Sequence, residues 1–251
     1  MKPKAIKHTR DLMGMTITVE IADYSAKESD IDMVFSYFES VEKRFSVFKD
    51  DSEITLINNG KISQSQYSED MKTVFVLAEK TKSQTNGYFD IIAPDGKYNP
   101  SGIVKGWAIY NASKMLLEKG LKNFYVEAGG DIQAHGLNGQ GMKWSVGIQN
   151  PFDPSQIVKV IRLKDMGIAT SGTYRRGLHV YNPHNAKELL TEIVSISVIG
   201  PNIYEADRFA TAAFAMGAQG INFIENLKGF EGYMINKDGI AVQTSDFIRY
   251  L

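Results

Sequence analysis

The chain has 251 residues, a formal net charge of -1 at pH 7 and no cysteine. Its length lies between one and two typical domains, so we expect residues 1–251 to form a single unit of two closely joined lobes. The balanced charge argues against nucleic acid and anionic membranes as partners, and the lack of cysteine excludes disulfides, thiolate metal sites and a cysteine nucleophile.

The amino-terminal segment carries basic residues but no apolar region that would make it a signal peptide. No stretch of the sequence reaches the roughly 18 apolar residues that a membrane-spanning helix needs. As written, the sequence predicts a cytoplasmic chain without a transmembrane segment, although a trimmed exported form would look the same.

The first part of the chain predicts a strand and then a helix. Apolar and polar residues alternate from Met15 to Ile21, which is the pattern of a half-buried strand that opens a sheet. Ser29 and Asp32 have the spacing of a capping box at the start of a helix. The apolar face of this helix contains Ile31, Val34, Phe35, Phe38, Val41 and Phe45.

Two polar segments separate this helix from the next one. Residues 49–52 have the composition of a turn, and residues 63–68 form a polar connector. A second helix should end near Asn86-Gly87. Its apolar residues are Met71, Val74, Phe75 and Ala78.

The centre of the chain contains a glycine turn, an amphipathic helix, a buried strand and a second glycine turn. Gly102 and Gly106 bracket the predicted helix start, where free N–H groups and the helix dipole suit an anion such as phosphate. Gly120 caps the helix, and a strand then runs from Lys122 into Gly129-Gly130. Glycine at both ends of a helix is also ordinary turn chemistry, so both interpretations stay open.

The second half of the chain is richer in short strands, separated by Asn-Pro, Asp-Pro and glycine turns. A late helix stops at Gly217, a short helix runs through Leu227, and Asn236-Lys237-Asp238-Gly239 turns a hairpin. Strands clustered between irregularly placed helices indicate an α+β fold, with mixed sheets and flanking helices. We expect these strands at residues 144–148, 157–163, 167–170, 178–181 and 194–199.

Asp207 and Thr211 lie four residues apart on the late helix, so both side chains project from one face. Their oxygen atoms suit a hard cation such as Mg²⁺, which commonly takes few ligands from protein. Alternatively, Asp207 complements the helix dipole and Thr211 bonds to its own backbone. Spacing alone does not decide between these two interpretations.

Seven segments match the motifs of one known family in the family's order. They are MGM at Met13, FSVFKDDSEITLIN from Phe45, NGYFDI from Asn86, NPSGIVKGWAIY from Asn99, FYVEAGGDIQAHG from Phe124, ATSGTYRRGLHVYNP from Ala169 and EADRFATAAFAMG from Glu205. In these segments the chain resembles the ApbE family, flavin transferases that take FAD and attach FMN to a protein. The resemblance covers nearly the whole chain and implies an ApbE-like fold.

The resemblance implies a Mg²⁺ site, because the residues matching Asp207 and Thr211 bind Mg²⁺ in ApbE-like enzymes and the residue matching Gly102 adds an oxygen. It also aligns His179 with the histidine of an H-x-x-D-P motif, which makes His179 the candidate base that removes a proton from a hydroxyl. Asn182 stands where that motif usually has aspartate. The carboxylate that would orient the histidine is therefore missing.

The same resemblance nominates residues for binding FAD. Lys105 would neutralise a phosphate as a point charge. Phe48 replaces a frequent tyrosine and keeps the ability to stack, and Asn99 replaces a frequent aspartate and keeps an acceptor. The nominated residues are Met13, Phe48, Tyr88, Phe89, Asp90, Asn99, Lys105 and Glu127.

Together these matches imply a Mg²⁺-dependent FAD:protein FMN transferase, with FAD as substrate and an acceptor flavoprotein as partner. A Ser or Thr hydroxyl of the acceptor would displace AMP and keep FMN as a phosphoester. Hydrolysis of FAD to FMN and AMP, and flavin binding without catalysis, are the alternatives. The sequence that the family usually modifies, with Ser/Thr-Gly-Ala-Thr in it, does not occur in this chain.

Overall fold

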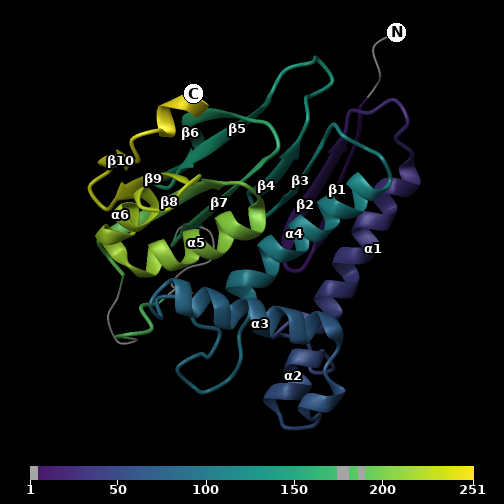
Figure 1. The fold of residues 1–251 in the computed structure, drawn as a ribbon, viewed down its shortest axis with the longest axis vertical. Coiled ribbons are helices and arrows are strands. Elements are labelled where there is room, and N and C mark those ends of the chain that lie inside the picture. The colour runs from purple at the N-terminus through teal and green to yellow at the C-terminus, as the bar shows by residue number, and fades with distance from the viewer. Residues whose placement is uncertain (1–4, 174–180, 186–189) are drawn as a thin grey trace.

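The computed structural model describes residues 5–173, 181–185 and 190–251. An eight-stranded sheet carries helices on one face and a two-stranded ribbon on the other (Figure 1). In spatial order its strands are β1 (Ile6–Leu12), β2 (Met15–Ile21), β3 (Phe124–Ala128), β4 (Asp131–His135), β7 (Met166–Gly172), β8 (Ile193–Gly200), β9 (Glu231–Asn236) and β10 (Ala241–Gln243). The ribbon consists of β5 (Trp144–Asn150) and β6 (Asp153–Leu163).

The helices are grouped between runs of strands and lie on one face of the sheet, as is typical of the α+β class. They are α1 (Glu28–Phe45), α2 (Glu53–Asn58), α3 (Glu69–Gln84), α4 (Ser101–Glu118), α5 (Ile203–Ala215) and α6 (Gly220–Glu225). Short 3₁₀ turns occupy Gln64–Gln66, Gly217–Gln219 and Phe247–Tyr250. No helix within the described ranges is long and apolar enough to cross a membrane.

The α+β class expected from the sequence is confirmed, but the sheets are not mixed. Every strand pairing among the described residues is antiparallel. Short turns join β1 to β2, β3 to β4, β5 to β6 and β9 to β10, and such turns can join only antiparallel partners. One sheet runs through both halves of the chain, because β4 pairs with β7.

Four of the five strands predicted in the second half are confirmed as parts of β5, β6, β7 and β8. The fifth, at residues 178–181, lies outside the described residues except for Tyr181. The hairpin between β9 and β10, turned at residues 237–240, is confirmed as well.

β1 is a strand that the alternation pattern did not predict. It is an edge strand whose side chains are largely exposed, so its sequence needs no apolar alternation. Met13 and Gly14 form the two-residue turn to β2, and both have positive φ (54° and 68°), as a tight hairpin requires. β2 therefore lies inside the sheet and does not open it.

α1 begins at a different cap from the predicted one. Its N-cap is Lys27, whose N–H donates to Asp30 Oδ2 at 2.8 Å, so Ser29 lies within the first turn. Asp32 instead pairs with Arg10 Nη2 of β1 at 2.6 Å. The predicted apolar face is confirmed, because all of its residues are buried.

Two hydrophobic cores lie on opposite faces of the large sheet. The first packs α1, α4 and α5 against one face and contains Trp107. The second packs the ribbon against the other face and joins Trp144 and Leu163 to Ile168 and Ile199. Both faces are thus covered over much of the sheet, and the space for a ligand lies at one end of its strands.

Candidate active site

A cleft of about 860 Å³ lies where the β1–β2 turn, the β3–β4 turn and the end of β7 meet the amino-terminal end of α4. α5 and the segment 88–93 complete its walls. Predicted site residues from every part of the chain line this cleft: Met13, Phe48, Tyr88, Phe89, Asp90, Asn99, Gly102, Lys105, Asp207 and Thr211. The fold therefore brings these residues together, and their individual roles stay predictions.

α4 and α5 approach each other closely at Gly106. A Cβ atom at Gly106 would lie 2.6 Å from Asp207 Cβ and 2.9 Å from the carbonyl oxygen of Ile203, so the contact requires glycine. Gly106 is inside α4 and does not bracket its start, in contrast to the sequence-based expectation. Its N–H donates to Asp207 Oδ2 at 2.7 Å and so fixes one carboxylate oxygen.

This hydrogen bond also affects the carbonyl of Gly102. In an α-helix the N–H of Gly106 is the group that points at the carbonyl four residues earlier, which is that of Gly102. This N–H also donates to Asp207, and a carbonyl oxygen has two lone pairs, so the Gly102 oxygen has capacity for another partner. Thr211 Oγ1 lies 3.5 Å from it.

Asp207 belongs to a buried cluster of opposite charges. Lys105 Nζ lies 2.5 Å from Asp131 Oδ2 and 3.6 Å from Asp207 Oδ1. Burial raises the pKa of Asp207 to about 7, an effect that Lys105 opposes and the Asp131 carboxylate reinforces. Asp131 was not predicted as a site residue, although it directly follows the Gly129-Gly130 turn.

Gly102, Asp207 and Thr211 offer a carbonyl, a carboxylate and a hydroxyl at one wall of the cleft. Such hard oxygen ligands suit Mg²⁺, which completes its octahedron with water and phosphate oxygens. In the part of the chain that the structure describes, no group of three or more His, Asp or Glu side chains could hold a metal. The residues fit a cation that takes few protein ligands, and its binding stays a prediction.

Aromatic side chains also line the cleft. Phe48 is 94% exposed, and the ring of Tyr88 packs edge-on against the ring of His184 with their centroids 4.6 Å apart. Phe89 is buried, and its ring would lie 3.2 Å from a Cβ atom at Gly102. Phe48 and Tyr88 are thus placed to contact a ligand, whereas Phe89 packs beneath the first turn of α4.

Asp90 and Asn99 are held in place by partners of their own. Asp90 Oδ2 lies 2.7 Å from Lys82 Nζ, and its Oδ1 accepts the N–H of Ile92. Asn99 Oδ1 accepts from both the N–H and the hydroxyl of Ser101, at the start of α4. The Asp90 carboxylate and the Asn99 amide are therefore held in fixed positions at the cleft.

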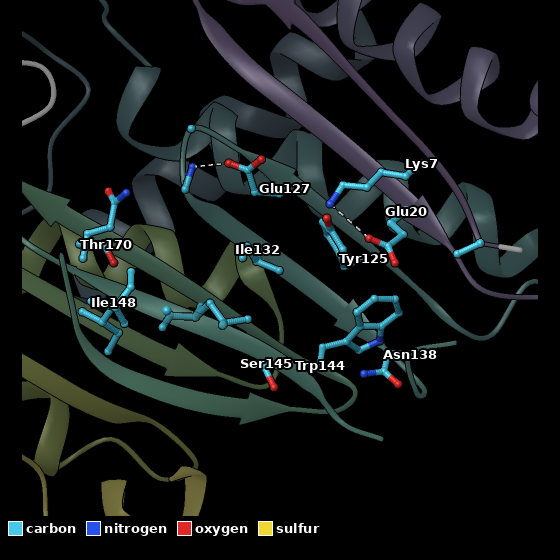
Figure 2. A pocket seen from close by; sticks show the side chains of 18 of the residues that line it. Lys7, Glu20, Tyr125, Glu127, Ile132, Asn138, Trp144, Ser145, Ile148 and Thr170 are labelled. Atoms are coloured by element: carbon cyan, nitrogen blue, oxygen red, sulfur yellow. Dashed lines mark hydrogen bonds and ion pairs between the residues drawn. The ribbon is translucent and has the colours of Figure 1, made fainter. Parts of the chain in front are cut away.

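Among the described residues, Glu127 is a predicted site residue that does not line the cleft. Glu127 Oε1 accepts the N–H of Gly130 at 2.6 Å, and its side chain faces a second pocket on the other face of the sheet (Figure 2). His179 lies outside the described residues. Tyr181 and Pro183 of the same motif do line the cleft, whereas Asn182 Oδ1 accepts the N–H of His184 in a local turn.

A model of the ApbE family matches residues 13–99 and 92–234. The chain is also similar to curated relatives named FAD:protein FMN transferase. The protein from Escherichia coli (strain K12) is 31% identical over 160 residues, which cover 60% of this chain and 46% of the relative. The one from Haemophilus influenzae is 32% identical over 163 residues, covering 60% and 47%. The chain thus spans about half the length of the curated relatives it matches.

Solved structures share the fold over nearly their whole length. The flavin transferase ApbE from Vibrio cholerae has a TM-score of 0.84 at 23% identity, covering 99% of this chain and 100% of that one. The apo flavinyl transferase ApbE from Pseudomonas stutzeri has a TM-score of 0.86 at 19% identity, covering 100% and 99%. At such identities these structures establish the fold. Because the family model spans most of the chain and includes every residue of the cleft, this chain belongs to the ApbE family.

Proposed function

We propose that the chain is a Mg²⁺-dependent FAD:protein FMN transferase that moves the FMN half of FAD onto a Ser or Thr hydroxyl of an acceptor flavoprotein. The observation that carries the proposal is the cleft of about 860 Å³, which combines aromatic rings, a lysine and hard oxygen ligands. Its volume is in the range of small-molecule sites. The names of the curated relatives support the same activity.

The aromatic side of the cleft would bind the flat rings of FAD. Covering the exposed ring of Phe48 removes apolar surface from water, and stacked aromatic pairs add about 0.5–1.5 kcal/mol beyond that burial. Tyr88 is braced against His184, so its ring is held in position before the ligand arrives. These residues would contribute more to the affinity for FAD than to the rate of FMN transfer.

The wall formed by Gly102, Lys105, Asp207 and Thr211 would bind the pyrophosphate. Lys105 places a positive charge 3.6 Å from Asp207 Oδ1, and Gly102, Asp207 and Thr211 would hold the cation. When bound there, Mg²⁺ supplies neutralisation of the negative charge on the phosphates. The Gly106 N–H keeps Asp207 in place, so this wall needs little rearrangement.

The transfer forms a bond between the acceptor hydroxyl oxygen and the phosphorus of the FMN half. The bond between this phosphorus and the bridging oxygen breaks, and AMP leaves with that oxygen. We assign His179 as the base that takes the hydroxyl proton, which contributes about 10²- to 10⁴-fold to the rate. Positioning and charge neutralisation supply most of the remaining acceleration.

The test is incubation of the protein with FAD, Mg²⁺ and a peptide containing Ser-Gly-Ala-Thr, followed by intact mass measurement. Addition of FMN to the peptide supports the transferase. Free FMN and AMP without modified peptide would instead identify an FAD hydrolase. Unchanged FAD beside protein that binds flavin would identify a binding protein.

A further inference from the structure

A second pocket of about 640 Å³ lies beside the ribbon, on the face of the large sheet opposite the helices (Figure 2). Its floor is formed by strands β1 to β4, through Lys7, Glu20, Tyr125, Glu127 and Ile132. Its wall is β5, of which the consecutive residues 144–149 all line the pocket. Consecutive residues of a strand point to alternate faces, so a space that touches all of them runs along the edge of the strand.

Along this edge of β5, backbone N–H and C=O groups point away from β6 and can hydrogen-bond to an added strand. β6 pairs with β5 along the other edge, and within the described ranges no further strand pairs with β5. In an antiparallel pair, alternate residues direct their N–H and C=O groups away from the partner strand. An extended polypeptide can pair with such an edge and become an added strand.

The pocket adjoins the cleft at Gly129 and Thr170, which line both. Figure 2 shows Asn138 and Trp144 at one end of the pocket, and Ile148 and Thr170 at the other. β5 has seven residues and is therefore about 23 Å long. A strand lying along β5 would thus have one end at the cleft.

The side chains around the pocket suit a polypeptide of mixed polarity. Lys7 Nζ lies 3.4 Å from Glu20 Oε2, and the ring of Tyr125 packs edge-on against Trp144 with the centroids 5.1 Å apart. Ile132 lines the pocket nearer to the cleft, where Ile148 is buried in the ribbon core. The side chains of an added strand would therefore meet both charged and apolar partners along the groove.

We propose that this groove, the space between the β5 edge and the floor residues named above, binds an extended segment of the acceptor flavoprotein. The segment pairs with β5 as a third strand of the ribbon and places its Ser or Thr in the cleft past Gly129 and Thr170. This inference rests on the proposed function, because it assumes that a polypeptide hydroxyl has to reach the cleft.

The lack of cysteine makes a selective block of the groove possible. Gln140 lines the far end of the groove and is exposed, so Gln140→Cys supplies a single thiol there. The probe is a peptide with Ser-Gly-Ala-Thr and a flank of about seven residues on each side, enough to span β5. After coupling of a polyethylene glycol maleimide, kcat/KM for this peptide should fall about tenfold or more, with unchanged FAD affinity in a flavin fluorescence titration.

Ser65→Cys with the same modification is the matched control, because Ser65 is exposed in the 3₁₀ turn at Gln64–Gln66 and does not line the groove. Its kcat/KM should equal that of the unmodified protein. An unchanged kcat/KM in modified Gln140→Cys would overturn the groove as the acceptor site.

Backbone methylation of the peptide tests the pairing itself. Strand addition predicts that N-methylation of every second residue lowers kcat/KM, whereas methylation of the residues between them does not. Equal effects at all positions would refute pairing with the β5 edge.

The two proposals fail in different ways. If the unmodified protein transfers FMN to no peptide, the proposed function is wrong, and peptide binding measured by fluorescence anisotropy then tests the groove directly. Binding that is lost in modified Gln140→Cys and kept in modified Ser65→Cys supports the groove. Equal binding by both modified variants overturns it.

Discussion

Among the described residues of the cleft, Asp207 is one whose charge responds to pH near neutrality. Burial raises the pKa of its carboxyl to about 7. Below this pH the carboxyl holds a proton that a cation has to displace, because metal ligands bind in their ionised form. Mg²⁺ affinity should therefore rise with pH between about 6 and 8, approaching tenfold per unit on the acidic side. Calorimetric titration at several pH values measures this slope.

Two variants separate the charge of Asp207 from the rest of the site. Asp207→Asn should abolish the pH slope, since the amide does not titrate in this range. Thr211→Val should weaken Mg²⁺ binding at every pH and keep the slope, because it removes only a neutral oxygen. A Mg²⁺ affinity that is the same at all pH values in the unmodified protein would contradict the assignment.

Replacing His179 separates the affinity for FAD from the rate of FMN transfer. His179→Ala should keep FAD affinity within about twofold and lower the rate of FMN transfer about 10²- to 10⁴-fold, because a base acts in the transition state. Flavin fluorescence titration and the peptide assay give the two quantities. Equal losses in both would make His179 a binding residue.

At the scale of elements, the contact between α4 and α5 shapes the cation site. Gly106→Ala places a Cβ atom 2.6 Å from Asp207 Cβ, at a point where both helices are buried. We expect the free energy of unfolding to fall by about 1–3 kcal/mol, as for other overpacked cores. Mg²⁺ affinity should fall too, since the displaced carboxylate loses its hydrogen bond from residue 106. Urea unfolding and calorimetry check both effects.

The control for this substitution lies on the same helix. Glu118 is exposed at the last residue of α4, so Glu118→Ala should change the free energy of unfolding by no more than about 0.5 kcal/mol. If Gly106→Ala were as stable as Glu118→Ala and bound Mg²⁺ normally, the helices would not be as tightly packed as the structure indicates.

At the scale of the whole molecule, two cores share one sheet, and each core contains one of the two tryptophans. Trp107 reports on the helical core and Trp144 on the ribbon core, so Trp107→Phe and Trp144→Phe each leave one reporter. Because both cores depend on the same strands, we expect their urea transitions to coincide with each other and with the loss of helix signal. Separate midpoints would instead indicate two independently folding lobes.

The sequence by itself determined those features that depend on neighbours along the chain. The alternation in residues 15–21 and the apolar face of the first helix encode burial within one element, and both are confirmed. The end of α4 follows from Gly120, which takes the predicted left-handed conformation with φ of +83°. The motifs likewise identified the family, because each is a local run of residues.

The tertiary structure decided what depends on residues far apart in the chain. The polar edge strand β1 is fixed by its pairing with β2 rather than by its own pattern. Gly106 is needed because Asp207 lies against it, and Asp131 enters the site through its ion pair with Lys105. The groove along β5 exists because the ribbon covers only part of the sheet. Side-chain periodicity records whether a residue is buried, but not which distant residue buries it, and only the packed structure supplies that partner.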